Sequence, residues 1–202
     1  MKKIMFNDRY GLTQAVIEGR KTMTRRIVPW ALTEQWMETV SDTPNTDGAY
    51  VHESEKDFYE REAPSYEVGE VVAVAQRYED LADIYQDKDS YLLQLSKVYG
   101  CNPEDVMKLP GWTNKMFVKS ELMPRRILIT GIRCERLQQI SDYECLEEGI
   151  SLDCPLAYSC NDISKVFNTP REAFASLIDK ISGRGTWKSN PWVVAYEFKL
   201  VK

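Results

Sequence analysis

The segment from Gly19 to Arg26 gathers residue types that could do chemistry. After the glycine, it holds four cationic side chains and two threonine hydroxyls within seven residues. Side chains alternate between the two faces of an extended chain, so Lys21 and Thr24 can meet only if the chain bends after Gly19. Neighbouring cations lower the pKa of a lysine, and a neutral lysine can activate a threonine hydroxyl. The segment therefore predicts either an exposed basic loop or a site in which Lys21 activates Thr24.

Other common catalytic and metal-binding groups are scarce. The one histidine, His52, lies in a polar and acidic stretch, and we interpret it as a solvated loop side chain. The five cysteines form no CxxC pair, so the ligand spacing typical of a structural zinc site is missing. We therefore expect no metal and no cofactor.

Length and composition indicate a single globular domain, with room for a large insertion. The chain has 202 residues, of which 43% are hydrophobic and 28% are charged, and this balance suits a chain with a substantial core. No apolar run approaches the roughly 20 residues of a membrane span. No long apolar stretch follows Lys2 and Lys3, so a signal peptide is not expected either. We expect a cytoplasmic protein without a membrane partner.

Charge is distributed unevenly along the chain. The net charge is −5, but residues 1–26 have a balance of +5, residues 27–110 a balance of −12 and residues 111–202 a balance of +2. An acidic protein is a poor candidate for long contacts with a nucleic acid backbone, although a small basic pocket is compatible with it. We interpret the acidic middle as a solvated insertion and expect residues 31–64 to lie outside the main fold.

Hydrophobic patterns predict both helices and strands, and the fold class they indicate is α+β with a mainly antiparallel sheet. No βαβ rhythm appears. The strands 71–75, 127–136 and 193–201 are expected to lie in one curved sheet, whereas residues 31–64 are expected to be largely loop. Further elements are predicted as strands at 4–6 and 116–118, as helices at 9–18, 33–39 and 80–99, and as helices that begin at capping boxes at Ser141 and Thr169.

The pattern Gly-Arg-Lys-Thr-x-Thr-x-Arg at residues 19–26 resembles the ASCH domain family, whose fold is a PUA-like β-barrel. Residues 66–74 are similar to the family's second strand, and residues 127–150 are similar to its central strand and the helix after it. The element Met-Pro-Arg-Arg-Ile at 123–127 and the ending at 187–198 resemble a longer, bacterial and phage-associated branch.

The resemblance implies one domain over residues 1–202, with insertions at about 31–64 and 79–110. Its expected form is a small PUA-like β-barrel with flanking helices and an acidic, partly helical insertion.

The resemblance also implies an activity, the hydrolysis of the acetyl amide of N4-acetylcytidine-like nucleosides without a metal. The implied catalytic residues are Lys21, Thr24 and Glu148. In these roles Thr24 attacks the acetyl carbonyl, Lys21 accepts the proton of the threonine, and Glu148 orients the lysine or carries the proton to the leaving amine. A solvated Glu148 at the end of a helix, next to Glu147, is the alternative.

A binding module without catalysis is the second hypothesis, because other members of the superfamily bind RNA or modified bases. A basic pocket with an aromatic neighbour could hold one base and one phosphate. We interpret Trp192 as a core residue and Trp187 as the stacking candidate. A ribonuclease is a third hypothesis, and it would also need Lys21 as its base. The expected partner is a modified nucleoside or a short single-stranded RNA, and the expected substrate-binding residues are Arg20, Arg26, Lys115, Arg126, Trp187 and Asn190.

Overall fold

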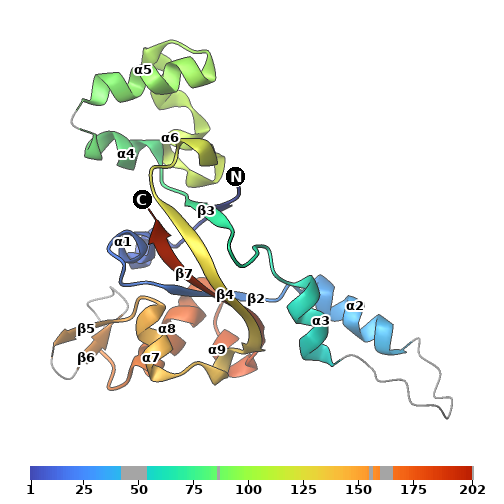
Figure 1. Cartoon of the computed structure of the whole chain (residues 1–202). Coiled ribbons are helices and arrows are strands. Elements are labelled where there is room, and N and C mark those ends of the chain that lie inside the picture. The colour runs from blue at the N-terminus through green and yellow to red at the C-terminus, as the bar shows by residue number, and fades with distance from the viewer. Residues whose placement is uncertain (42–53, 86, 155–156, 160–165, 202) are drawn as a thin grey trace.

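A five-stranded mixed sheet forms the centre of the molecule (Figure 1). The computed structural model describes residues 1–41, 54–85, 87–154, 157–159 and 166–201. The strand order is β1-β3-β4-β7-β2; β1 is parallel to β3, and the other neighbours are antiparallel. The strands are β1 (Lys3–Ile4), β2 (Met23–Ile27), β3 (Val71–Val74), β4 (Arg126–Arg136) and β7 (Trp192–Val201).

The prediction that three strands share one, mainly antiparallel sheet is confirmed. The strands β3, β4 and β7 are consecutive neighbours, with Val72 opposite Ile127 and Ile129 opposite Phe198. Among the described residues β1 and β2 are edge strands with one neighbour each, so the sheet is open. A separate pair, β5 (Ser151–Cys154) and β6 (Ala157–Ser159), lies beyond the sheet.

Helices α1 (Leu12–Ile17), α7 (Asp142–Glu147) and α8 (Pro170–Ser182) contribute buried residues to the same core as the sheet. The sequence specifies α8 clearly. The Thr169 hydroxyl accepts a hydrogen bond from the Glu172 amide at 3.1 Å, and Pro170 occupies the first turn, where its missing N–H costs nothing. Phe174, Leu177 and Ile178 then recur at helical spacing and are buried. The short helix α9 (Thr186–Ser189) follows.

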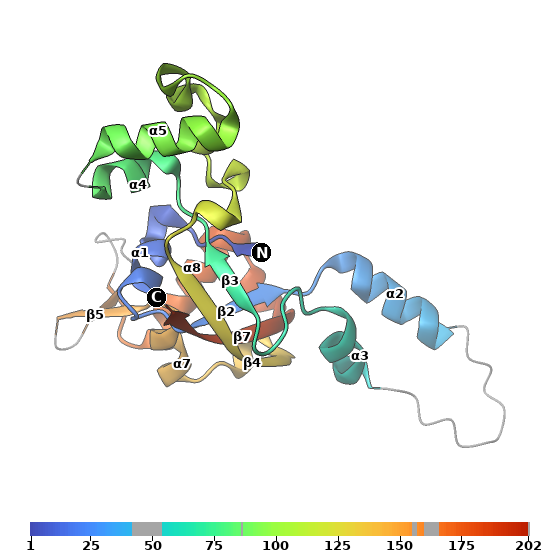
Figure 2. The ribbon, with the colours of Figure 1, turned by 45° about the horizontal axis from the view of Figure 1, so that its top comes forward.

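A helical unit with its own small core occupies the connection between β3 and β4. Its buried cluster includes Tyr78, Leu95 and Val106, each 0% exposed. Figures 1 and 2 both show this unit standing off one end of the sheet. It contains α4 (Tyr78–Ile84), α5 (Lys88–Tyr99), α6 (Pro110–Thr113) and the 3-10 helices Pro103–Lys108, Lys115–Phe117 and Ser120–Leu122. Two further 3-10 helices, Asp8–Tyr10 and Leu137–Gln139, lie outside this unit.

Two predictions in this unit are wrong in detail. The strand predicted at 116–118 is a 3-10 turn, because the Asn114 side chain accepts the Met116 amide at 2.9 Å and curls the chain. The helix predicted at 80–99 is divided into α4 and α5. The chain is extended at Tyr85, and Asp87 caps a new helix by accepting the Ser90 amide at 3.0 Å.

The prediction for residues 31–64 is also corrected. They contain most of α2 (Trp30–Ser41) and all of α3 (Glu55–Glu62), whereas residues 42–53, with His52, lie outside the described residues. Ser54 caps α3 by accepting the Asp57 amide at 3.2 Å. Phe58 and Tyr59 of α3 are buried in the main core, so this helix is part of the main fold rather than a solvated insertion. None of the helices in the described ranges has the length and apolarity needed to cross a bilayer.

The place of α3 in the core is testable by a matched pair of substitutions. Phe58 is 4% exposed and Phe117 is 55% exposed. We expect Phe58→Ala to lower the free energy of unfolding by about 3–5 kcal/mol, because it leaves a cavity in the core. Phe117→Ala should change it by about 0.5 kcal/mol or less. Urea denaturation measures both, and equal effects would mean that α3 does not support the core.

Candidate active site

Lys21 lies in the turn that joins α1 to β2, and backbone hydrogen bonds hold this turn on several sides. Gly19 has a φ of 75°, a conformation that suits glycine and reverses the chain after α1. The Lys21 amide then donates to the Ala15 carbonyl at 3.0 Å, and the Thr22 amide donates to the Glu147 carbonyl at 2.9 Å. The end of α1 and the end of α7 are thereby tied to the start of β2, and the side chain of Lys21 is directed inward.

Glu148 comes from the end of α7. The predicted capping box is confirmed at the start of this helix, where the side chains of Ser141 and Glu144 each accept a hydrogen bond from the backbone amide of the other residue. Glu148 is 4% exposed, so its interpretation as a solvated helix-end carboxylate is wrong. Gly149 follows with a φ of 98°, and a Cβ at this position would come within 3.3 Å of Leu12 Cδ2. Glycine therefore allows the end of α7 to approach α1 closely.

Lys21 and Glu148 form a buried ion pair. The Lys21 ammonium donates to Glu148 Oε2 at 2.6 Å and to the Glu148 carbonyl oxygen at 2.7 Å. Burial disfavours the charged ammonium and lowers the pKa of Lys21, with Arg25 and Arg26 acting in the same direction, whereas Glu148 opposes the shift. Lys21 is therefore a candidate base, and Glu148 fixes its position.

A cavity of about 400 Å³ brings the candidate catalytic residues together. Lys21, Glu148 and Thr24 line it, and Thr24 is 5% exposed. The bend after Gly19 thus brings Lys21 and Thr24 to one cavity, although within the described chain Lys21 donates to Glu148 and not to Thr24. Much of the remaining lining is apolar, with Phe6 after β1 and Leu177 of α8.

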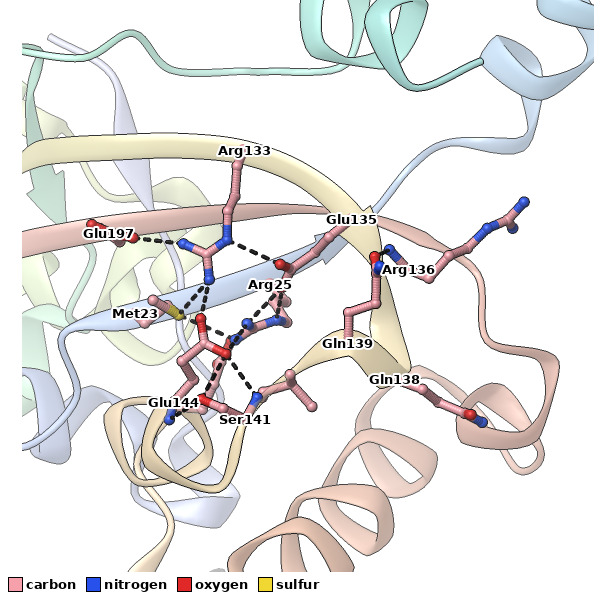
Figure 3. A network of polar contacts seen from close by, with 12 residues as sticks. Met23, Arg25, Arg133, Glu135, Arg136, Gln138, Gln139, Ser141, Glu144 and Glu197 are labelled. Atoms are coloured by element: carbon pink, nitrogen blue, oxygen red, sulfur yellow. Dashed lines mark hydrogen bonds and ion pairs between the residues drawn. The ribbon is translucent and has the colours of Figure 1, made fainter. Parts of the chain in front are cut away.

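Arg25 binds the other side of Glu148. Figure 3 shows the wider ionic network around Arg25, which includes Glu135 and Glu144. Its Nη1 lies 3.2 Å from Glu148 Oε1, and its Nε donates to Glu135 Oε1 at 2.8 Å. Its Nη2 lies 2.6 Å from the same Glu135 oxygen and 3.3 Å from Glu144 Oε2, as ion pairs rather than as aligned hydrogen bonds. The side chain of Arg25 is 1% exposed, so these carboxylates compensate a fully buried charge.

Arg133 extends this network toward the surface. It donates to Glu135 at 2.9 Å and to Glu197 at 2.6 Å, and it also pairs with Glu144. Burial raises the pKa of Glu144, but hydrogen bonds from Ser141 and the charges of Arg25 and Arg133 outweigh burial, and the pKa is lowered. Glu144 is therefore held ionised beside Arg25, and this ion pair helps to keep the Arg25 guanidinium in place against Glu148.

Three expected substrate-binding cations lie at different distances from the cavity. Arg26 lines it, is exposed, and donates to the Met5 carbonyl at 2.6 Å. Lys115 lies next to the cavity, because its ammonium donates to the carbonyl of Phe6, a lining residue. The same ammonium donates to Asp8 Oδ1 at 2.7 Å. Arg20 pairs with Glu18 at 2.6 Å on the exposed side of the turn and is not among the lining residues.

The other three expected substrate-binding residues lie outside the lining of this cavity. Trp187 packs edge-on against Phe174 at 6.2 Å, and the Arg171 guanidinium covers its ring at 5.1 Å. Asn190 adopts a left-handed conformation, and its side chain accepts the Gln138 amide at 2.8 Å. Arg126 is the first residue of β4 and lies in register with Ala73 of β3.

Arg25 is the residue that sequence reasoning missed. The pattern contained a partial signal, because Met23 and Arg25 share one face of β2, so a face that buries Met23 also directs Arg25 toward the interior. A buried arginine requires carboxylates, and the acidic residues at 135, 144 and 148 were available to supply them.

Neither metals nor relatives add to this picture. In the part of the chain that the structure describes, no group of three or more His, Cys, Asp or Glu side chains is arranged to hold a metal ion. The chain matches no protein-family model, and comparisons with curated proteins and with solved structures likewise give no match.

The close approach at Gly149 can be tested against Gly69, whose φ is 88°. Alanine is strained at both positions by about 1–2 kcal/mol, since both need a positive φ. Nothing lies within 4 Å of a Cβ at Gly69, whereas a Cβ at Gly149 meets Leu12 at 3.3 Å. We expect Gly149→Ala to lower the free energy of unfolding by about 1 kcal/mol more than Gly69→Ala does. Equal losses in denaturant titrations would show that the approach is not tight.

Proposed function

We propose that the protein is a metal-independent amidohydrolase that removes an acyl group from modified nucleosides of the N4-acetylcytidine type. The observation that carries the proposal is the buried Lys21–Glu148 pair on the wall of the cavity that Thr24 also lines. A lysine acts as a base only in its neutral form. Burial lowers the pKa of Lys21 and so favours that form.

In the proposed first step, neutral Lys21 accepts the hydroxyl proton of Thr24 while Thr24 Oγ1 attacks the acyl carbonyl carbon. The C–N bond of the amide then breaks, and Lys21 gives the proton to the leaving nitrogen. The products of this step are an acyl ester on Thr24 and the free amine of the nucleoside. Glu148 orients Nζ for this transfer through the 2.6 Å hydrogen bond.

In the proposed second step, a water molecule replaces the amine. Neutral Lys21 takes one proton from this water, and the water oxygen attacks the ester carbon of Thr24. The ester C–O bond breaks, Lys21 returns its proton to Thr24, and the carboxylic acid leaves. One amide and one water are thus converted to one acid and one amine, with no oxidant, reductant or metal required.

The size and lining of the cavity support a nucleoside as substrate. A volume of about 400 Å³ lies in the range typical of small-molecule sites. Phe6 and Leu177 supply an apolar wall for a planar base, and the exposed Arg26 at the same cavity suits the polar or anionic end of the ligand.

A binding module for RNA or modified bases is the alternative, and one observation favours it. The hydrogen bonds of the Lys21 ammonium described above both go to Glu148, so the pair could serve only to shape a polar pocket. The alternative retains Arg26 as the ligand-facing cation and predicts no turnover.

The ASCH-family resemblance and its PUA-like barrel belong to this proposal. In their favour, β3, β4 and β7 lie together, and the 19–26 segment contributes Lys21 and Thr24 to one cavity. The open sheet of the described residues does not by itself support a closed barrel.

The enzyme proposal predicts that the purified full chain converts N4-acetylcytidine to cytidine and acetate in the presence of a chelator. Thr24→Val keeps the shape of the side chain but lacks the nucleophile, so it should lower turnover at least ~100-fold, a loss typical of a directly participating group. Thr24→Ser restores a hydroxyl and should recover much of the rate. Chromatography of the products measures each variant.

Glu147→Gln is the matched control for Glu148→Gln. Glu147 accepts a hydrogen bond from the Thr22 hydroxyl at 3.3 Å and does not line the cavity. The Glu147→Gln variant should therefore keep most of the turnover, whereas the Glu148→Gln variant should lose it. Lys21→Arg should fail as an enzyme because a guanidinium stays charged. A wild type that binds the nucleoside without turning it over, with affinity retained in Lys21→Arg, would instead support the binding module.

A further inference from the structure

One lysine of the helical unit, Lys115, contacts the chain at the edge of the Lys21 cavity. Figures 1 and 2 both place the N-terminus beside this unit. The Lys115 ammonium donates to the carbonyl of Phe6, to Asp8 Oδ1 at 2.7 Å and to the Thr13 hydroxyl of α1 at 3.2 Å. These three acceptors match the three donors of an ammonium, and the side chain is 15% exposed. Lys115 thus joins the helical unit to Phe6 and to α1.

The segment that carries Phe6 leaves the sheet after β1, and side chains bond to two of its carbonyls. The Met5 carbonyl accepts a hydrogen bond from Arg26 at 2.6 Å, and the Phe6 carbonyl accepts one from Lys115. The Thr13 hydroxyl is a more distant donor to the Phe6 carbonyl, at 3.3 Å. Because side chains hold these carbonyls, the place of Phe6 depends on Lys115 more than it would within a strand ladder.

The Phe6 ring is an aromatic part of the cavity wall close to Lys21. Its centroid lies 5.8 Å from Lys21 Nζ, and the ring packs against that of Phe198 with centroids 5.8 Å apart. This distance is near the outer limit of a cation–π contact, so the main effect of the ring on Lys21 is to exclude water. Burial is the largest cause of the lowered pKa of Lys21. The place of Phe6 therefore acts on both Lys21 and the apolar lining.

We propose that Lys115 is a positioning residue of the Lys21 cavity, which holds the Phe6 carbonyl and thereby keeps the Phe6 ring in the wall, against Lys21 and a bound nucleobase. The inference rests on the proposed function, because it takes this cavity as the substrate site. It gives the helical unit between β3 and β4 a role in the site, although the unit contributes none of the lining residues.

An NMR titration of the Lys21 side chain tests the positioning role without any need for turnover. Lys115→Met keeps an unbranched side chain but removes the donors. We expect it to raise the pKa of Lys21, because a displaced Phe6 ring admits water to the ammonium. Lys119→Met is the matched control in the same unit and should leave the titration unchanged, because the Lys119 ammonium donates to the Val98 carbonyl, at 3.4 Å, within the unit.

Lys115→Met also removes a positive charge, and a double-mutant cycle with Phe6→Leu separates this effect from that of the ring. The charged groups that act on the pKa of Lys21 are Glu148, Arg25 and Arg26. If Lys115 acts through the ring, Lys115→Met should have little effect on the Lys21 titration in the Phe6→Leu background. An equal shift in both backgrounds would identify a charge effect and overturn the proposal, and so would an unchanged titration in Lys115→Met alone.

Turnover of N4-acetylcytidine distinguishes a failure of this inference from a failure of the proposed function. Lys115→Met should raise KM about five-fold, because the wall loses part of its contact with the nucleobase. It should also move the rise of kcat/KM to higher pH, because a base with a raised pKa becomes neutral at higher pH. A wild type without turnover would contradict the amidohydrolase, and the Lys21 titration would still decide the role of Lys115. Turnover with KM and the Lys21 titration both unchanged in Lys115→Met would overturn the positioning role alone.

Discussion

The burial of the Lys21 ammonium against the Glu148 carboxylate is the constraint on which the surrounding structure depends. An ammonium removed from water is strongly destabilising unless a partner lies within hydrogen-bonding distance. Because Lys21 and Glu148 are far apart in the sequence, the end of α7 must reach the end of α1. Gly149 makes this approach sterically possible, and the Thr22–Glu147 backbone hydrogen bond fixes its register.

The ion pair is asymmetric, and the asymmetry determines how the site responds to change. Glu148 forms ion pairs with two cations, Lys21 and Arg25. Lys21, in contrast, has an ion pair with one carboxylate in the described structure, that of Glu148. Loss of Lys21 would leave Glu148 paired with Arg25, but loss of Glu148 would leave Lys21 buried without a counter-charge. The charge state of Lys21 therefore depends on Glu148, which opposes the lowering of the Lys21 pKa by burial.

Much of the core could be predicted from the sequence, because its signals are local. Strands β3, β4 and β7 and helix α8 follow from apolar periodicity and from the cap at Thr169. Helix α3 was missed, because Phe58 and Tyr59 are two apolar residues in an otherwise charged segment and owe their burial to contacts with distant strands. The strand expected at 116–118 failed because a side-chain cap at Asn114 outweighed strand propensity.

The candidate site was predictable to the extent that its residues lie in one segment. Lys21, Thr24 and Arg25 belong to a single pattern, but the carboxylates that hold Arg25, at 135, 144 and 148, are distant in the sequence and are brought to it by the fold. The stacking role expected for Trp187 has no counterpart in the cavity, since its ring already packs against Phe174 and Arg171. Contacts between distant segments, including those that form the Lys21 cavity, required the structure.

The most direct test of a neutral, buried base is an NMR titration of the Lys21 side chain, followed at Cε and Nζ and assigned with Lys21→Arg. Lys21 should titrate below the value near 10.4 that is usual for lysine, and below the exposed lysines of the same protein. In Glu148→Gln its pKa should fall further, because Glu148 is the group that raises it. A Lys21 that titrates together with the exposed lysines, or above them, would contradict its proposed role as the base.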